Sequence, residues 1–269
     1  MKEIDSLPLH NPSYGSAIIG GFNLLKRKYY SLAGSLLVLM MLFGVGFVID
    51  LLLNRSLPSY IDLWRFPLTL WITMLDMGLF YILAKAIANN PWKIGNLFWA
   101  FHHQEAWVFA IIYSVIASIL SIGLPTVTPG QKLPSDWLMH AHVLITLFIL
   151  FFLEIFAGYI LMLYSAYGVE IKKAATLSLQ IFGKKWKWLL FPVVLSIIIF
   201  IAFLGVSIIL GMLAALLAFV FKLSGLMPIG KIVLVIFFVA ILVAIYITTF
   251  IWMYASMIIA SGALMADEN

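Results

Sequence analysis

Long stretches without a charged side chain limit what this chain can fold into. From Leu189 to Phe221 the sequence contains no Asp, Glu, Lys, Arg or His, and most of its residues are aliphatic or aromatic. A helix that crosses a bilayer needs about 20 such residues, and a lipid-exposed segment must satisfy its backbone hydrogen bonds internally. The stretch does not alternate in polarity as a transmembrane strand would. The sequence therefore predicts transmembrane helices.

The composition extends this expectation to the whole chain. Of the 269 residues, 64% are hydrophobic and 10% are charged, whereas soluble domains have about 45–50% apolar and about 25% charged residues. We therefore expect an all-α, polytopic membrane helix bundle in which residues 1–269 form one transmembrane domain. Proline at position 192 leaves open whether the fifth span is kinked or broken. Six stretches are predicted to span the membrane: Ser31–Leu53, Pro67–Ala88, Trp107–Leu124, Trp137–Tyr167, Leu189–Phe221 and Lys231–Leu264.

Lysine and arginine residues predict the orientation of these spans. Eleven of the 16 lie in the N-terminal segment and in the second and fourth connections. The positive-inside rule places these segments in the cytoplasm, and six spans then place both termini there. The first 20 residues lack the apolar run and small-residue cleavage site of a signal peptide. We therefore expect the first apolar run to be a retained helix.

Three similar segments precede the first, third and fifth predicted spans. Each begins with spaced apolar residues, becomes polar and then enters a span flanked by aromatic side chains. When Leu25, Phe101 and Phe182 are set in register, the segments are 76 and 81 residues apart. The alternative is that any connection between apolar spans is basic and aromatic. The register predicts three tandem units of a short cytoplasmic interfacial helix and two spans, at about 17–90, 91–167 and 169–264.

The second and third of these segments carry a resemblance. In KIGNLFWAFHHQEAW, Leu97, Phe98 and Phe101 form an LF-x-x-F pattern, and in VEIKKAATLSLQIFGKKWKWLLF, Ala174 and Ser178 form an A-x-x-x-S pattern. Over most of residues 90–262 the chain resembles uncharacterised bacterial integral membrane proteins. These are related to the membrane domain of some glycerophosphodiester phosphodiesterases. The resemblance implies a six-helix protein of the bacterial inner membrane and brings no catalytic residues.

Two acidic side chains interrupt predicted spans. Glu154 lies in LFILFFLEIFAGYILM, and Asp76 lies in LTLWITMLDMGLFYILAK. A carboxylate in hydrocarbon is costly unless it is neutralised or paired. One repeat length after Asp76 falls two residues before Glu154, so both are expected at a similar depth. Helical spacing places the small residue Gly158 beside Glu154, which predicts that this face packs inside the bundle.

These carboxyls predict a polar cluster inside the membrane. Its expected members are Asp76, Glu154, Thr73, Tyr246 and Thr249. Intramembrane carboxyls often lie at functional sites, where they relay protons or couple a substrate. The alternative is a protonated or hydrogen-bonded carboxyl that holds two helices together. The sequence leaves both interpretations open.

Eight basic residues form a predicted cytoplasmic group. Their ordinary roles are to set the topology and to attract anionic lipid headgroups, so membrane lipids are the expected partner. The more specific interpretation is a headgroup-binding pocket or a docking surface for a soluble partner. Other membrane subunits are a further partner that the sequence leaves open. The group consists of Lys26, Arg27, Lys28, Lys172, Lys173, Lys184, Lys185 and Lys187.

Two sets of possible metal ligands lie near predicted membrane interfaces: His102, His103 and Glu105, and Asp136, His140 and His142. The expected orientation places them on opposite sides of the membrane, and each set alone is small for a closed site. The chain has no cysteine and no phosphate-binding loop, nucleophile elbow or HExxH motif. We therefore expect no catalytic residue, no metal, no cofactor and no nucleic-acid partner.

Three functions follow from these patterns. The leading hypothesis is a non-enzymatic accessory, assembly or lipid-interacting component of the inner membrane. The alternative is a small transporter or permease that is proton-coupled through its intramembrane carboxyls, which predicts a cavity connecting Asp76 and Glu154. The third is an intramembrane lipid-modifying enzyme, which predicts a clustered acid, histidine or serine site at one interface.

Overall fold

The computed structural model describes residues 13–56, 65–122, 137–223 and 227–265. Within these ranges all regular structure is helical, which confirms the predicted class. The α-helices are α1 (Tyr14–Ser56), α2 (Arg65–Ile87), α3 (Gln104–Ile122), α4 (Trp137–Tyr167), α5 (Ile171–Leu179), α6 (Lys187–Leu223) and α7 (Met227–Ser261). The 3-10 helices of the described ranges are η2 (Ile94–His102), η3 (Gln180–Phe182) and η4 (Gly262–Leu264).

Five of the described helices are long and apolar enough to cross a membrane. A sixth candidate consists of η2 and α3, which meet at an angle of 83° and together pass the same test. The chain is therefore a membrane protein, and its described part contains five or six possible spans. The number of spans depends on the predicted third span, because α3 passes this test only together with η2. Six spans and the threefold repeat remain predictions.

The longest helices exceed the thickness of a bilayer. At 1.5 Å per residue, the 37 residues of α6 extend over about 55 Å. Proline at position 192 lies inside α6, near its start, and the helix continues through it. Proline is best tolerated near a helix start, where few intrahelical bonds are lost. The fifth predicted span is therefore one unbroken helix.

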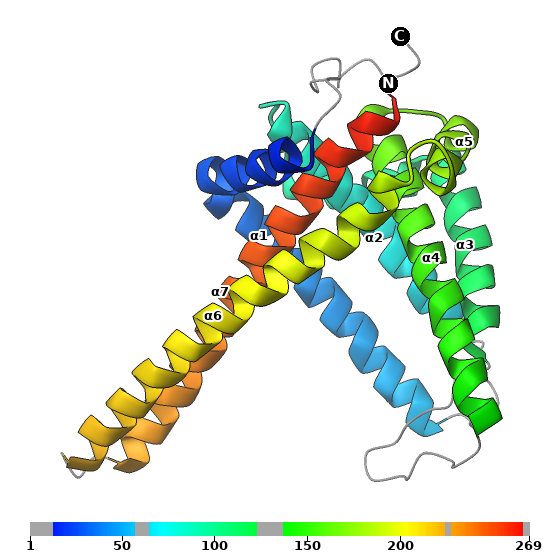
Figure 1. Ribbon diagram of the computed structural model, residues 1–269. Coiled ribbons are helices and arrows are strands. Elements are labelled where there is room, and N and C mark those ends of the chain that lie inside the picture. Colours follow the sequence, from blue (N-terminus) through cyan, green and yellow to red (C-terminus); the bar gives the residue numbers. More distant parts are fainter. Residues whose placement is uncertain (1–12, 57–64, 123–136, 224–226, 266–269) are drawn as a thin grey trace.

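The helices pack at one end of the molecule and separate toward the other (Figure 1). The first turns of α1, the last turns of α7, η2 and α5 lie together at the packed end, whereas the α6–α7 hairpin diverges from α1 and α4. Burial follows this arrangement. The last turns of α7 are mostly buried, whereas Ile232 to Tyr246 on the same helix is mostly exposed.

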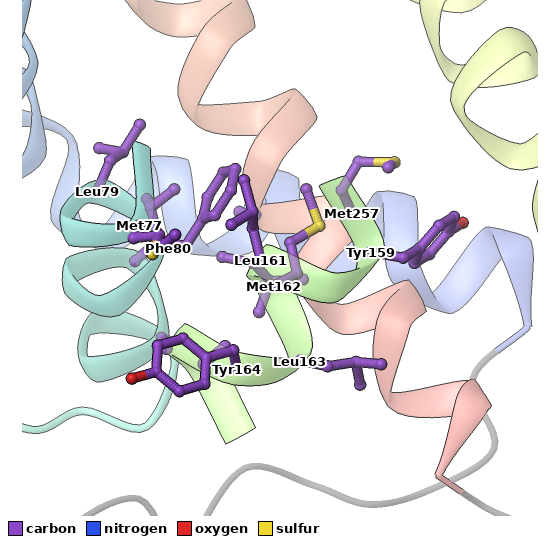
Figure 2. Close-up of a cluster of buried hydrophobic side chains, with 14 of the residues drawn as sticks. Met77, Leu79, Phe80, Tyr159, Leu161, Met162, Leu163, Tyr164 and Met257 are labelled. Carbon is purple, nitrogen blue, oxygen red and sulfur yellow. The ribbon is translucent and has the colours of Figure 1, made fainter. Parts of the chain in front are cut away.

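Side chains from all seven α-helices of the described ranges form the buried cluster, and Figure 2 shows part of it, with labelled side chains from α2, α4 and α7. Phe80, Leu161, Met162 and Met257 belong to it. A glycine permits one of the closest contacts: a Cβ on Gly78 would collide with the backbone of Leu97, so only glycine lets η2 lie this close to α2.

Side chains that bond to backbone carbonyls join the helices at the packed end. Tyr167 Oη donates to the Ile258 oxygen of α7 over 2.9 Å, and Tyr159 Oη donates to the Trp188 oxygen of α6 over 2.7 Å. Trp252 Nε1 donates to the Ile18 oxygen of α1 over 3.0 Å. These bonds connect α1, α4, α6 and α7 directly, so polar contacts as well as apolar packing stabilise the packed end.

Candidate functional site

A cavity of about 440 Å³ lies between α2, α3, α4, α6 and α7. Five of its lining residues, Phe80, Ile155, Leu161, Met162 and Met257, also belong to the buried cluster, so the cavity adjoins the buried core. Its walls are mainly apolar. Hydroxyl and carboxyl groups are contributed by Thr69, Thr73, Asp76, Tyr113, Glu154, Ser196 and Tyr254.

Asp76 reaches the cavity from α2. Thr69, Thr73 and Phe80 line the cavity from the same helix, and their spacing of three and four residues places all four on one face. The hydroxyl of Thr73 donates to the Thr69 carbonyl oxygen over 2.7 Å, so its proton is directed back to the helix. Asp76 is half-buried, and within the described ranges no hydrogen bond reaches its carboxyl group. The carboxyl therefore faces the cavity.

Glu154 reaches the same cavity from α4. Ala157, Gly158 and Leu161 line it beside Glu154, as helical spacing predicts. Glu154 itself is exposed, so the cavity is open at this carboxyl. Asp76 from α2 and Glu154 from α4 both line this cavity. The structure thus brings the two intramembrane carboxyls together in one site.

Tyr113 is a site residue that the sequence analysis missed. This tyrosine of α3 is buried, and its hydroxyl donates to Glu154 Oε1 over 2.5 Å. A bond of this length falls in the range of charge-assisted hydrogen bonds between a hydroxyl and a carboxylate. The available signal was a single phenol within the apolar segment AWVFAIIYSVIASIL. Its partner lies 41 residues away, so the sequence alone did not indicate the contact.

The contribution of α7 differs from the expected one. Tyr246 and Thr249 do not line the cavity, whereas Tyr254 does. Thr249 Oγ1 donates to backbone carbonyl oxygens of its own helix, and Tyr246 is about half exposed. The rings of Tyr246, Phe250 and Tyr254 follow one another along α7, and Tyr254 meets Phe80 of α2 at 5.2 Å. The depth at which α7 packs against α2 decides which tyrosine reaches the cavity.

The predicted basic group lies on helices that meet at the packed end (Figure 1). Lys185 Nζ donates to the Ala263 carbonyl oxygen over 2.6 Å, and Lys28 Nζ lies 5.7 Å from the centre of the Trp92 ring. On α5, Ala174, Leu177 and Ser178 are buried, so the helix presents an apolar face to the bundle and its lysines outward. The exposed members are Lys26, Arg27, Lys172, Lys173, Lys184 and Lys187.

The two histidines before α3 bond to the backbone. His102 Nδ1 and His103 Nδ1 each donate to the carbonyl oxygen four residues earlier, over 3.1 and 3.0 Å. Among the described residues, no three His, Asp or Glu side chains are grouped closely enough to hold a metal ion. Asp136 and the side chains of His140 and His142 lie outside the described part of the chain.

No protein-family model, curated protein or solved structure matches the chain. The resemblance to the bacterial membrane family therefore remains a prediction, and the cavity provides the basis for a functional proposal.

Proposed function

We propose that the protein is a small membrane transporter whose substrate site is the cavity and whose proton-carrying groups are Asp76 and Glu154. The observation that carries this proposal is that both intramembrane carboxyls line one open cavity. Its volume falls within the range of about 300–1,000 Å³ that is usual for small-molecule sites. We therefore place the transporter hypothesis above the accessory component that the sequence favoured.

The partners of the two carboxyls support a transport role over a purely structural one. A carboxyl that only ties helices together would bond to a neighbouring helix in a dry contact. Glu154 does bond to Tyr113 of α3, but Asp76 faces open space without a hydrogen bond in the described part of the protein. Carboxyl groups inside membrane spans often relay protons, and both of these groups line a cavity in which a proton can be bound and released. Exchange of that proton is the coupling step that we propose.

Cysteine accessibility tests whether the cavity is a water-connected site. The chain has no native cysteine, and a Cβ on the cavity-lining Gly158 would meet no atom within 4 Å. We expect the Gly158→Cys protein, in vesicles, to react with a small membrane-impermeant thiol reagent. The matched control is Gly205→Cys, which has the same free space on the exposed apolar surface of α6.

If the protein is a proton-coupled transporter, the accessibility of the Gly158→Cys thiol is expected to depend on pH, because protonation changes the charge of the cavity. Glu154→Gln and Asp76→Asn should each reduce this dependence in the Gly158→Cys background. A Gly158→Cys protein that reacts no faster than Gly205→Cys, at any pH, would show that the cavity is filled with lipid or closed. That result would overturn the transporter proposal.

A second candidate function is the accessory or lipid-interacting component, and one observation favours it. The outer part of the α6–α7 hairpin packs on itself, and residues such as Ile201, Ile209, Met212 and Val235 are at least 60% exposed (Figure 1). Native mass spectrometry of the protein in lipid nanodiscs would test this function. A stable complex with another subunit or with retained lipid supports it, whereas a lipid-free monomer counts against it.

We also propose the finer topology. It consists of six spans in three repeated units, with both termini and the basic group on the cytoplasmic side of a bacterial inner membrane. The five or six apolar helices and the common location of the basic helices support this arrangement. Single cysteines at Lys184 and near the end of α6 should react from opposite sides of sealed vesicles. Reaction from the same side would contradict it.

A further inference from the structure

We propose that the substrate of the cavity is a cationic amphiphile: an organic cation, such as an ammonium or phosphonium compound, with an apolar or aromatic body. This inference rests on the proposed transport function and names its substrate class. It follows from the charge, the walls and the opening of the cavity.

The charged groups of the cavity are all acidic. Asp76 and Glu154 line it, and no Lys, Arg or His is among its lining residues. The carboxyl of Asp76 has no hydrogen-bonding partner in the described ranges and adjoins the open volume. A bound cation would lower the repulsion between the two carboxylates, whereas a bound anion would add to it. The site therefore selects for positive charge.

The remaining groups that face the two carboxyls are neutral. They are Thr69 and Thr73 from α2, Tyr113 from α3, Ser196 from α6 and Tyr254 from α7. A proton and a cationic substrate therefore compete for the same negative charge. When a substrate cation binds, a carboxyl O–H bond breaks, the electron pair stays on the carboxylate and the proton leaves to water. Binding is consequently expected to strengthen as the pH rises.

The walls of the cavity suit an apolar body. Phe80 and Tyr254 contact each other at 5.2 Å, and Phe151 lies on the α4 side. Aromatic faces attract cations, most strongly when water is excluded. Met162, Met253 and Met257 add flexible thioether side chains that adapt to ligands of different shape. A small inorganic cation would leave these surfaces unused, whereas an amphiphilic cation contacts both the carboxyls and the walls.

The charge preference is tested with two thiol reagents that carry the same reactive group. The full-length Gly158→Cys protein is treated in vesicles with a methanethiosulfonate that bears a trimethylammonium group, or with one that bears a sulfonate. We expect the cationic reagent to react about tenfold faster, after correction for the reagents' rates with a free thiol. Glu154→Gln should reduce this ratio, and Glu105→Gln should leave it unchanged because Glu105 is exposed and lies outside the cavity.

Tetraphenylphosphonium and tetraphenylborate test the amphiphile itself, because they share a shape and differ in the sign of their charge. Tetraphenylphosphonium should protect Gly158→Cys from labelling, and more strongly at higher pH, whereas tetraphenylborate should not. Equal reaction with both thiol reagents, or equal protection by both tetraphenyl ions, would overturn the substrate class and leave the transporter proposal standing. Failure of Gly158→Cys to react with either reagent would overturn both.

Discussion

Tyr113 donates a hydrogen bond to Glu154, and this bond joins α3 to α4 at the wall of the cavity. The Tyr113 side chain is buried, whereas the Glu154 side chain is exposed to the cavity. The bond therefore holds the cavity-facing carboxyl group of Glu154 in one orientation. It also gives the short helix α3 a polar contact with the bundle.

Replacing Tyr113 with phenylalanine should destabilise the protein moderately. The change removes the donor to Glu154 and keeps the aromatic ring, so we expect a loss of about 1–2 kcal/mol in the free energy of unfolding. Thermal unfolding in detergent, followed by tryptophan fluorescence, measures it. Tyr246→Phe is the matched control, because this half-exposed tyrosine does not line the cavity. Equal losses of stability in the two variants would show that the hydrogen bond to Glu154 does not stabilise the protein measurably.

Alanine at position 78 should prevent η2 from packing on α2. The added Cβ would collide with the Leu97 carbonyl group, and backbone atoms cannot move aside as a flexible side chain can. We expect a destabilisation of about 2 kcal/mol or more, comparable to overpacking in a core. Gly34→Ala in α1 is the control, since its Cβ would meet no atom within 4 Å and alanine favours the helix by about 0.5–1 kcal/mol.

Thermal denaturation of the purified variants distinguishes these two glycine positions. Gly78→Ala is expected to unfold at a lower temperature than the native protein, and Gly34→Ala at the same or a higher temperature. A Gly78→Ala protein as stable as the native one would mean that η2 does not lie against α2 as described.

Removal of the charge at Lys185 should loosen the end of α7. Its ammonium group bonds to the Ala263 carbonyl oxygen in η4, which follows α7, and a cation is favourable at a helix C-terminus. Lys185→Met is expected to cost about 1–2 kcal/mol of stability and to increase hydrogen exchange in residues 258–265. Lys184→Met serves as the control, because Lys184 is exposed. Similar exchange in both variants would count against this role.

Carbodiimide labelling should identify a protonated carboxyl in the cavity. Dicyclohexylcarbodiimide is apolar and reacts with the acid form of a carboxyl group. We expect an adduct on Asp76 that decreases as the pH is raised, because deprotonation removes the reactive form. Mass spectrometry locates the adduct. Preferential labelling of the exposed Glu105 would contradict the idea that the cavity retains a proton.

Much of the candidate site was visible in the sequence because charged groups are rare in apolar spans. Asp76 and Glu154 stand out for this reason, and helical periodicity places Thr73 and Gly158 on their faces, where both residues line the cavity. The periodicity of one helix does not determine its position along the axis of a neighbouring helix. For this reason the sequence favours Tyr246 and Thr249 on α7, whereas in the structure Tyr254 lines the cavity. Tyr113 was missed because its importance arises from a contact between helices.

The sequence by itself determined that the chain is helical and lies in a membrane, because long apolar segments must satisfy their backbone hydrogen bonds internally. Only the tertiary structure decided that α6 continues through Pro192, that η2 packs on Gly78 and that side chains from five helices line the cavity. These features depend on packing distances and on the relative depth of the helices. Apolar composition is nearly the same at every depth of a span, so it does not encode that alignment.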